Sequence, residues 1–169
     1  MSSKKNMILN DKAIAQKIRR MAYEIAEECF DENEIMLVGI LPNGYEFARL
    51  LKQEVEKILK ADIHLFSLQI DKLNPNPDQI FIKPSIESSF EQKTWIIADD
   101  VGNTGKTLFY SLSLFPPLKP KKIKTAILVE RQHKRYPVAS DFVGLSLSTT
   151  LKENIRVEFK GGKGTAYLE

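Results

Sequence analysis

The chain has 169 residues, a mass of 19.3 kDa and a formal net charge of +3 at pH 7. This length is close to the usual size of one domain, so we expect a single domain over residues 1–169, with residues 1–8 as a flexible start. A content of 43% hydrophobic and 28% charged residues excludes a disordered or fibrous protein. The small excess of positive charge does not by itself indicate a nucleic-acid partner.

The cysteine content and the amino-terminal residues indicate the cellular compartment of the protein. Cys29 is the only cysteine, so no internal disulfide is expected, and no Cys/His cluster has the spacing of a zinc site. Polar residues rather than an apolar run follow Lys4 and Lys5, so we expect no export signal. No stretch approaches the roughly 20 apolar residues that span a bilayer. We therefore expect a cytoplasmic protein with no membrane partner.

Helix and strand patterns alternate along the first half of the chain. Apolar residues at spacings of three and four predict an amphipathic helix, whereas a continuous run of branched apolar residues predicts a strand buried on both faces. Asn10 or Asp11 is the candidate cap of the first helix. These patterns predict a helix over 14–29, a strand over 35–41, a turn over 42–44, a helix over 45–60, a strand over 63–70 and a polar loop over 71–78.

The second half continues the alternation and ends in short strands. Pro116 and Pro117 stop the second-half helix, and the run 94–98 ends abruptly in Asp99 and Asp100. The patterns predict strands over 80–82, 94–98 and 123–129, a helix over 106–115 and a closing hairpin near the carboxyl terminus. Together they predict an α/β domain with a mainly parallel sheet flanked by helices, whose ligands gather at the carboxyl ends of the strands.

The segment 95–107 combines two kinds of binding group. Asp99 and Asp100 stand at a strand end, and a turn rich in glycine and threonine leads into a helix. Backbone N–H groups at a helix start, with the hydroxyls of Thr104 and Thr107, can hold a phosphate. Carboxylates cannot bind that phosphate, but they accept hydrogen bonds from sugar hydroxyls and support a magnesium ion through water. This combination predicts a phosphorylated sugar as the ligand.

Two other interpretations of the segment are weaker. Gly105, Lys106 and Thr107 match the end of a P-loop, but the residue five positions before Gly105 is Asp100 rather than glycine. Alternatively, the paired aspartates cap a turn and the Gly-Lys-Thr sequence simply starts a helix. The full thirteen-residue string favours the binding function over this structural interpretation.

The segment 95–107 closely resembles the phosphoribosyl-diphosphate-binding motif of type I phosphoribosyltransferases: an apolar strand, two acids, a spacer and Thr-Gly-Lys-Thr. The stretches 128–137 and 141–144 further resemble the family of bifunctional pyrimidine operon attenuators and uracil phosphoribosyltransferases. The resemblance covers nearly the whole chain. It implies the type I phosphoribosyltransferase fold with a small hood of short strands, and a homo-oligomer, either dimer or tetramer.

The resemblance also implies a reaction and its residues. The enzyme would transfer the phosphoribosyl group of phosphoribosyl diphosphate to a nucleobase, with Mg²⁺ as cofactor. Asp99 and Asp100 would be catalytic, holding the ribose hydroxyls and, indirectly, the metal. The 5′-phosphate would be bound by Asn103, Thr104, Gly105, Lys106 and Thr107. Uracil is the favoured base, and hypoxanthine or guanine stays open because purine enzymes share the Asp-Phe-Val-Gly stretch.

That stretch also supplies the expected base site. By the resemblance, Phe142 would stack on the base and the backbone of Val143 would read its edge. The other interpretation of Phe142 is an ordinary core aromatic.

Two segments depart from the family pattern. The turn 41–44 normally carries a basic residue but here reads Leu-Pro-Asn-Gly, so we expect the amides of Asn43 and Gly44, with Arg131, to bind diphosphate. The loop 71–78 is the candidate mobile loop that closes over the site and excludes water. The family has an arginine beside acidic residues in this loop, and here Lys72 is the only cation.

RNA binding, the family's other activity, is a possible but less favoured expectation. Basic residues expected from the family are replaced at Tyr23, Ala139 and Leu145, although Arg20 persists and Arg19 is added. The segment 119–135 contains seven basic residues and one acidic residue. It is either a phosphate-binding face or a solvated edge. A non-catalytic, nucleotide-sensing regulator that acts on RNA therefore remains an alternative to the enzyme.

Overall fold

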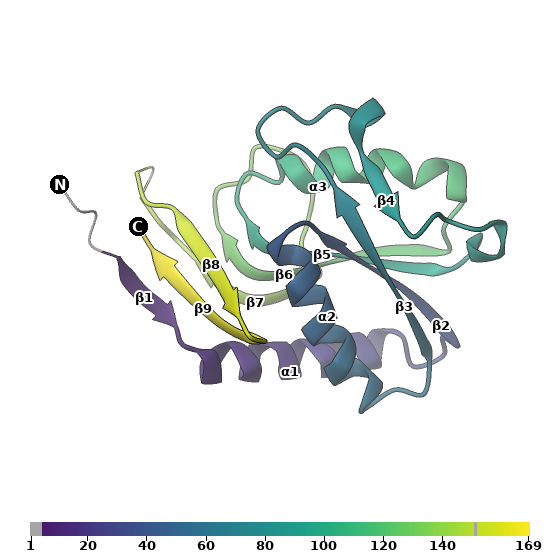
Figure 1. Ribbon diagram of the computed structural model, residues 1–169, viewed down its shortest axis with the longest axis horizontal. Coiled ribbons are helices and arrows are strands. Elements are labelled where there is room, and N and C mark those ends of the chain that lie inside the picture. The colour runs from purple at the N-terminus through teal and green to yellow at the C-terminus, as the bar shows by residue number, and fades with distance from the viewer. Residues whose placement is uncertain (1–4, 151) are drawn as a thin grey trace.

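A computed structural model describes residues 5–150 and 152–169 and shows a sheet of parallel strands with a smaller sheet beside it (Figure 1). Its helices and strands are β1 (Asn6–Leu9), α1 (Asp11–Glu28), β2 (Glu34–Ile40), α2 (Asn43–Glu56), β3 (Asp62–Gln69), β4 (Phe81–Lys83), β5 (Thr94–Gly102), α3 (Lys106–Ser111), β6 (Lys122–Arg131), β7 (Phe142–Leu147), β8 (Ile155–Lys160) and β9 (Lys163–Leu168). Short 3₁₀ turns occupy Pro77–Gln79, Ser88–Phe90, Leu112–Leu114 and Pro116–Leu118.

The main sheet has six strands in the order β4-β3-β2-β5-β6-β7. Only β4 runs antiparallel to its neighbour, β3, so the predicted mainly parallel α/β sheet is confirmed. Strand β5 lies between β2 and β6. Its carboxyl end therefore lies in the middle of the edge where ligands of parallel sheets gather.

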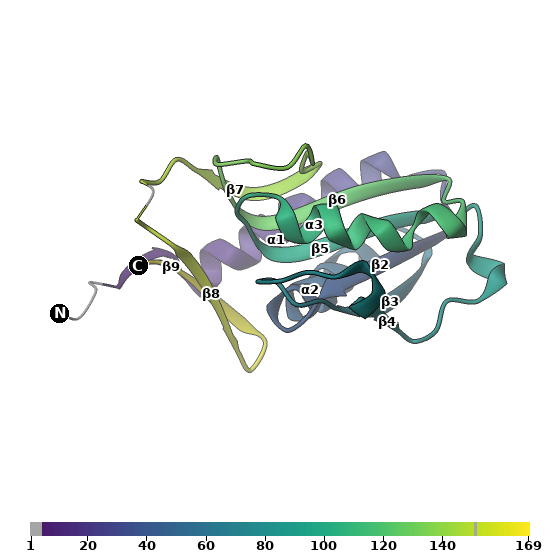
Figure 2. The ribbon, with the colours of Figure 1, turned by 90° about the horizontal axis from the view of Figure 1, so that it is seen from above.

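Helices cover both faces of this sheet. Successive strand residues point to opposite faces, so Ile35 and Leu37 pack with α1 and α2, whereas Met36 and Val38 pack in a second cluster with Leu108 of α3. Figures 1 and 2 show α1 and α2 on one side of the sheet and α3 on the other. The continuous apolar runs of the strands follow from this double coverage.

Helix α1 confirms the helix expected near the amino terminus. The side chain of Asn10 accepts a hydrogen bond of 2.8 Å from the backbone N–H of Ala13, which is the predicted cap. The apolar stripe is buried, and the helix is followed by Cys29. Within residues 5–150 and 152–169, no helix combines the length and the apolar character needed to cross a membrane.

Cys29 is fully buried at the end of this stripe, and burial raises the pKa of its thiol to about 11, from an ordinary value of 9.0. Because the thiolate is the reactive form, the native protein should hold about 100-fold less of it near pH 8 than an exposed cysteine would. We expect Ellman's reagent to label native Cys29 far more slowly than the same residue in denaturant. Equal labelling rates in the two conditions would contradict the buried position.

Several boundaries differ from the sequence predictions. Helix α2 covers Asn43–Glu56 rather than the predicted 45–60, so two residues of the predicted turn 42–44 form its first turn. Residues 6–8, expected in a flexible start, belong to β1, which pairs with β9; residues 1–4 lie outside the described residues. Strand β5 continues through Asp99 and Asp100 to Gly102, because β6 pairs with it along this length. The predicted helix 106–115 is shorter: α3 ends at Ser111 and 3₁₀ turns follow.

Strands β1, β9 and β8 form a separate antiparallel sheet, which is the expected hood. Figure 1 shows it as a layer to one side of the main sheet, close to both chain ends. The turn between β8 and β9 contains Gly161 and Gly162 at φ values of 58° and 78°. Glycine suits this left-handed backbone, so the predicted closing hairpin is confirmed. Strand β8 is an edge strand of the hood.

Candidate functional site

Two buried carboxylates form the centre of the site. Asp99 and Asp100 lie near the carboxyl end of β5, with 2% and 6% of their surfaces exposed. Asp99 Oδ1 accepts a hydrogen bond of 3.0 Å from the backbone N–H of Asp100. Lys72, from the loop after β3, places its Nζ 2.9 Å from Asp99 Oδ1 and 3.7 Å from Asp100 Oδ1. The loop named in the sequence analysis for its single cation therefore reaches the two aspartates through Lys72.

The pKa values of Asp99 and Lys72 depend on the charges around them. Burial raises the pKa of Asp99, the charge of Asp100 raises it further, and Lys72 opposes both effects. Burial alone would lower the pKa of Lys72, but the attraction of Asp99 and Asp100 outweighs this effect and keeps that pKa above its ordinary value. The pair of carboxylates is thus built to face a positive charge.

The turn after β5 is braced from two sides. Gly105, at the start of α3, has a φ of 84°, which is the left-handed conformation that glycine adopts without strain. The hydroxyl of Thr104 accepts a 3.3 Å hydrogen bond from the backbone N–H of Lys106, and its carbonyl accepts from the N–H groups of Arg135 and Tyr136 at 2.9 and 3.0 Å. The loop after β6 therefore fixes the shape of this turn.

The turn 41–44, which leads from the end of β2 into the first residues of α2, lies directly against the carboxylates. A Cβ atom on Gly44 would stand 2.8 Å from Asp99 Oδ1 and 2.9 Å from the carbonyl oxygen of Ala98. Only glycine allows this approach. The next contact reaches the hood: Asn43 Nδ2 donates a 2.9 Å hydrogen bond to the carbonyl of Val157 on β8. The turn thus joins the carboxylates on one side and the hood strand on the other.

These elements enclose a cavity of about 760 Å³. Most of the site residues that the sequence predicted line it: Asn43, Lys72, Asp99, Asp100, Asn103, Thr104, Gly105, Lys106, Thr107 and Arg131. Gly44 is not on the lining, although it lies against Asp99. Strand β8 supplies the opposite wall with all of its residues, Ile155–Lys160.

Arg131 has a structural task within this cavity. Only 7% of the residue is exposed, and its side chain donates hydrogen bonds to the hydroxyl of Thr149 and the carbonyl of Thr150. These contacts hold the segment that leads into β8. The guanidinium is therefore partly committed to shaping the cavity, in addition to the diphosphate role expected of it.

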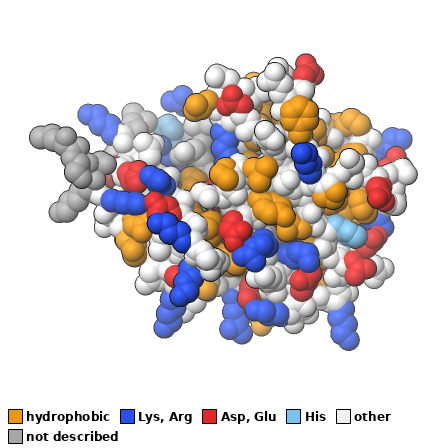
Figure 3. Space-filling view, viewed as in Figure 1, with side chains coloured by type: hydrophobic (Ala, Val, Ile, Leu, Met, Phe, Trp, Pro, Cys, Tyr) orange, Lys and Arg blue, Asp and Glu red, His pale blue; other side chains and the backbone are white. Residues whose placement is uncertain are grey.

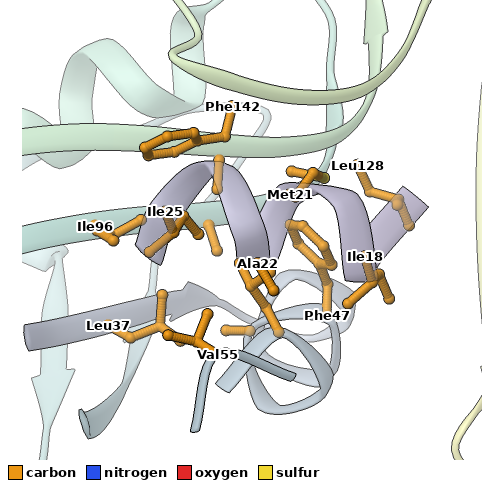
Figure 4. Packing of buried hydrophobic residues seen from close by; sticks show 14 of the residues in the cluster. Ile18, Met21, Ala22, Ile25, Leu37, Phe47, Val55, Ile96, Leu128 and Phe142 are labelled. Carbon is orange, nitrogen blue, oxygen red and sulfur yellow. The ribbon is translucent and has the colours of Figure 1, made fainter. Parts of the chain in front are cut away.

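The base-binding residues expected from the sequence do not reach the cavity of this structure. Phe142 is only 6% exposed and packs in the core with Ile25 and Ile96, beside helix α1 (Figure 4). The carbonyl of Val143 accepts a 2.8 Å hydrogen bond from Arg20. Neither residue lines the cavity. Helix α1 covers this face of β7, so an aromatic side chain there completes the core instead of meeting a ligand.

The sequence analysis assigned no site residue to strand β8, although this strand lines the cavity. Ile155, Arg156 and Val157 line the cavity from the hood. The sequence signal was an apolar residue at every second position from 155, a half-buried strand that was interpreted only as part of a closing hairpin. An edge strand beside a cavity offers backbone groups as well as side chains to a planar ligand.

The basic segment 119–135 is a charge-paired edge rather than a free cationic face. Four of its lysines lie near carboxylates: Lys121 at 2.8 Å from Glu32, Lys122 at 3.2 Å from Glu28, Lys124 at 3.5 Å from Asp141 and Lys134 at 2.9 Å from Glu130. On the face drawn in Figure 3, acidic side chains likewise lie among the basic ones. This pairing favours the solvated-edge interpretation over a phosphate-binding surface.

Comparison with known proteins identifies the family to which the sequence is similar. A family model described as the phosphoribosyl transferase domain matches residues 4–159. The bifunctional protein PyrR of Clostridium kluyveri is 33% identical over 159 residues, which cover 91% of this chain and 90% of that protein. The bifunctional protein PyrR of Macrococcus caseolyticus is 31% identical over 158 residues, covering 90% of this chain and 91% of the relative.

Solved structures with a similar fold are more distant in sequence. A hypoxanthine phosphoribosyltransferase of Trypanosoma cruzi superposes with a TM-score of 0.75 at 16% identity and covers 95% of each chain. A hypoxanthine-guanine phosphoribosyltransferase of Bacillus anthracis gives a TM-score of 0.72 at 19% identity, covering 89% of this chain and 84% of that one. At such identities the likeness concerns the fold.

Proposed function

Because the chain belongs to the type I phosphoribosyltransferases and has their fold, with PyrR proteins among its relatives, we propose that it transfers the phosphoribosyl group of phosphoribosyl diphosphate to uracil. One observation carries this proposal. The buried carboxylate pair, the braced turn after β5 and the hood strand β8 all open into the same cavity of about 760 Å³. A phosphorylated sugar with a planar base has matching groups on these three walls.

In the proposed reaction, the turn after β5 anchors the sugar. The backbone N–H groups of this turn, the side-chain amide of Asn103 and the hydroxyls of Thr104 and Thr107 would bind the 5′-phosphate, together with Gly105 and Lys106. The bracing of Thr104 by the next loop means that this anchor is formed before the ligand arrives. Fixing the phosphate sets the anomeric carbon opposite the base, which reduces the entropic part of the barrier.

Asp99 and Asp100 act by electrostatics. They would accept hydrogen bonds from the ribose hydroxyls and stabilise the positive charge that develops at the anomeric carbon as diphosphate leaves. The contact with Lys72, whose Nζ lies 2.9 Å from Asp99, supports the ability of these buried carboxylates to interact with a positive charge. Lys72 has to withdraw when the sugar binds, which couples the loop after β3 to ligand entry.

The donor set fits a magnesium ion that is shared with the ligand. Among the residues that the structure describes, no group of three or more His, Cys, Asp or Glu side chains could hold a metal alone. Asp99 and Asp100 would support the ion through water, and ligand oxygens would complete its shell, which is the usual arrangement for Mg²⁺. When bound, the ion supplies neutralising charge to the diphosphate. The carboxylates orient the sugar toward it.

The hood strand is the proposed base site. Ile155 and Val157 are buried apolar residues on the cavity wall, and β8 leaves one edge without a strand partner in the described part of the chain. A pyrimidine could pack on the side chains and exchange hydrogen bonds with the backbone. Uracil as the base is supported by the likeness of segments 128–137 and 141–144 to the pyrimidine regulator and uracil enzyme family.

The test is diphosphate release from phosphoribosyl diphosphate and Mg²⁺ with uracil, hypoxanthine, guanine, xanthine or adenine as acceptor. We expect release with uracil and formation of the corresponding nucleoside monophosphate. Release with a purine alone would overturn uracil as the acceptor but keep the transferase. No release with any base, while ligand binding persists, would favour the alternative of a non-catalytic regulator that senses nucleotides and acts on RNA.

An oligomer and RNA contact remain separate proposals. We propose a dimer or tetramer in solution, which sedimentation velocity would measure directly. RNA is the less favoured partner, because the lysines of segment 119–135 are paired with carboxylates.

A further inference from the structure

The cationic side chains that line the cavity differ in whether they have a hydrogen-bond or ion-pair partner. Five line it within the described residues: Lys72, Lys106, Arg131, Arg156 and Lys160. Four of them have partners: Lys72 has Asp99, Lys106 has the carbonyl of Leu73, Arg131 has Thr149 and Thr150, and Arg156 has Glu158 at 3.3 Å and Glu169 at 3.8 Å. Lys160 makes no ion pair and no side-chain hydrogen bond with residues 5–150 or 152–169.

Lys160 lies between two residues of its hairpin that are close to α2. Three residues before it, the carbonyl of Val157 accepts the hydrogen bond from Asn43, at the start of α2. Two residues after it, a Cβ on Gly162 would lie 3.7 Å from the guanidinium of Arg49, also on α2. Figures 1 and 2 both show the closed end of this hairpin beside α2. Lys160 therefore approaches the cavity from the side of the turn 41–44.

That side of the cavity is where a cation is needed. The sequence predicts that the amides of Asn43 and Gly44 bind the diphosphate group, and we place diphosphate there in the proposed reaction; this turn, 41–44, contains only Leu, Pro, Asn and Gly. Diphosphate carries several negative charges, and a lysine ammonium binds phosphate as a compact point charge. We propose that Lys160 supplies from the hood the positive charge that this turn lacks, and so binds the diphosphate group of the substrate. The assignment rests on the proposed phosphoribosyl transfer.

The experiment compares Lys160→Ala and Lys160→Arg with Lys163→Ala. Lys163 is the matched control because it pairs in register with Lys160 in the same hairpin, is exposed and does not line the cavity. Calorimetry would measure the affinity for inorganic diphosphate with Mg²⁺, and for uridine monophosphate. Loss of a hydrogen bond to a charged group predicts a fall of about 10-fold to 100-fold in diphosphate affinity for Lys160→Ala.

Four results accompany this loss if Lys160 binds diphosphate. The affinity for the monophosphate stays unchanged, because that product has no diphosphate. The KM for phosphoribosyl diphosphate rises while the KM for the base does not. Lys160→Arg keeps most of the affinity, and Lys163→Ala keeps all of it. A purely structural role of Lys160 would not separate diphosphate from monophosphate in this way.

Two outcomes would overturn the assignment: unchanged diphosphate affinity in Lys160→Ala, or an equal loss in Lys163→Ala, which would indicate a general effect of surface charge. A different result would contradict the proposed phosphoribosyl transfer without contradicting the role of Lys160. A wild-type protein that binds diphosphate through Lys160 but transfers to no base would support the assignment and contradict the enzymatic activity.

Discussion

Replacement of Asp100 by asparagine is expected to lower kcat/KM by about 10²-fold to 10³-fold, the usual effect of removing one group that stabilises transition-state charge. Asp100 suits this test because its contacts are few: the carboxylate lies 3.7 Å from Lys72, whereas Asp99 makes the closer contact at 2.9 Å. The amide has the same shape, so the buried position should accept it. Steady-state kinetics with phosphoribosyl diphosphate and the preferred base measures the loss.

The variant should also move the pH profile. The charge of Asp100 raises the pKa of Asp99, so neutral asparagine should lower that pKa and extend residual activity to lower pH. Asp62→Asn, on the exposed first residue of β3, is the control and should match the wild type in rate and pH profile. Activity of Asp100→Asn within a factor of two of the wild type, with the fold intact, would remove Asp100 from the proposed mechanism.

The parts of the fold that local pattern determines were predictable from sequence. The stripe of α1, the buried runs of β2 and β5 and the motif after Asp100 are each contained in about seven to eighteen consecutive residues. The spacing of the apolar residues in these segments indicates which face is buried. The positions of the carboxylate pair and of the turn after β5 therefore needed no tertiary information.

The contacts that complete the site depend on tertiary packing. Lys72 and Asp99 are 27 residues apart, and Asn43 and Val157 are 114 apart. Sequence proposed the loop lysine, but it contained no signal for the hydrogen bond that holds the hood to the turn. The burial of Phe142 was likewise not predictable from local sequence. An aromatic residue in an apolar strand can lie in the core or line a binding site, and here the packing of α1 places Phe142 in the core.

Gly44→Ala is expected to reduce activity by about 100-fold or more and to lower stability by about 1–3 kcal/mol. The added Cβ would lie 2.8 Å from Asp99 Oδ1 and 2.9 Å from the carbonyl of Ala98. Neither neighbour can retreat easily, because Ala98 is in the centre of the sheet and Asp99 is held by Lys72. The turn must then move away from the carboxylates, which separates the proposed diphosphate and ribose sites.

Kinetics and thermal unfolding distinguish the two effects of Gly44→Ala. If the added methyl group misplaces the turn, kcat/KM of the folded protein falls well below that expected from the unfolded fraction alone. Tyr45→Phe, the next position in α2, removes a hydroxyl without adding atoms and should leave both measurements unchanged. A Gly44→Ala protein that is less stable but fully active would mean that the close approach of this turn to Asp99 serves packing, and that diphosphate is bound elsewhere.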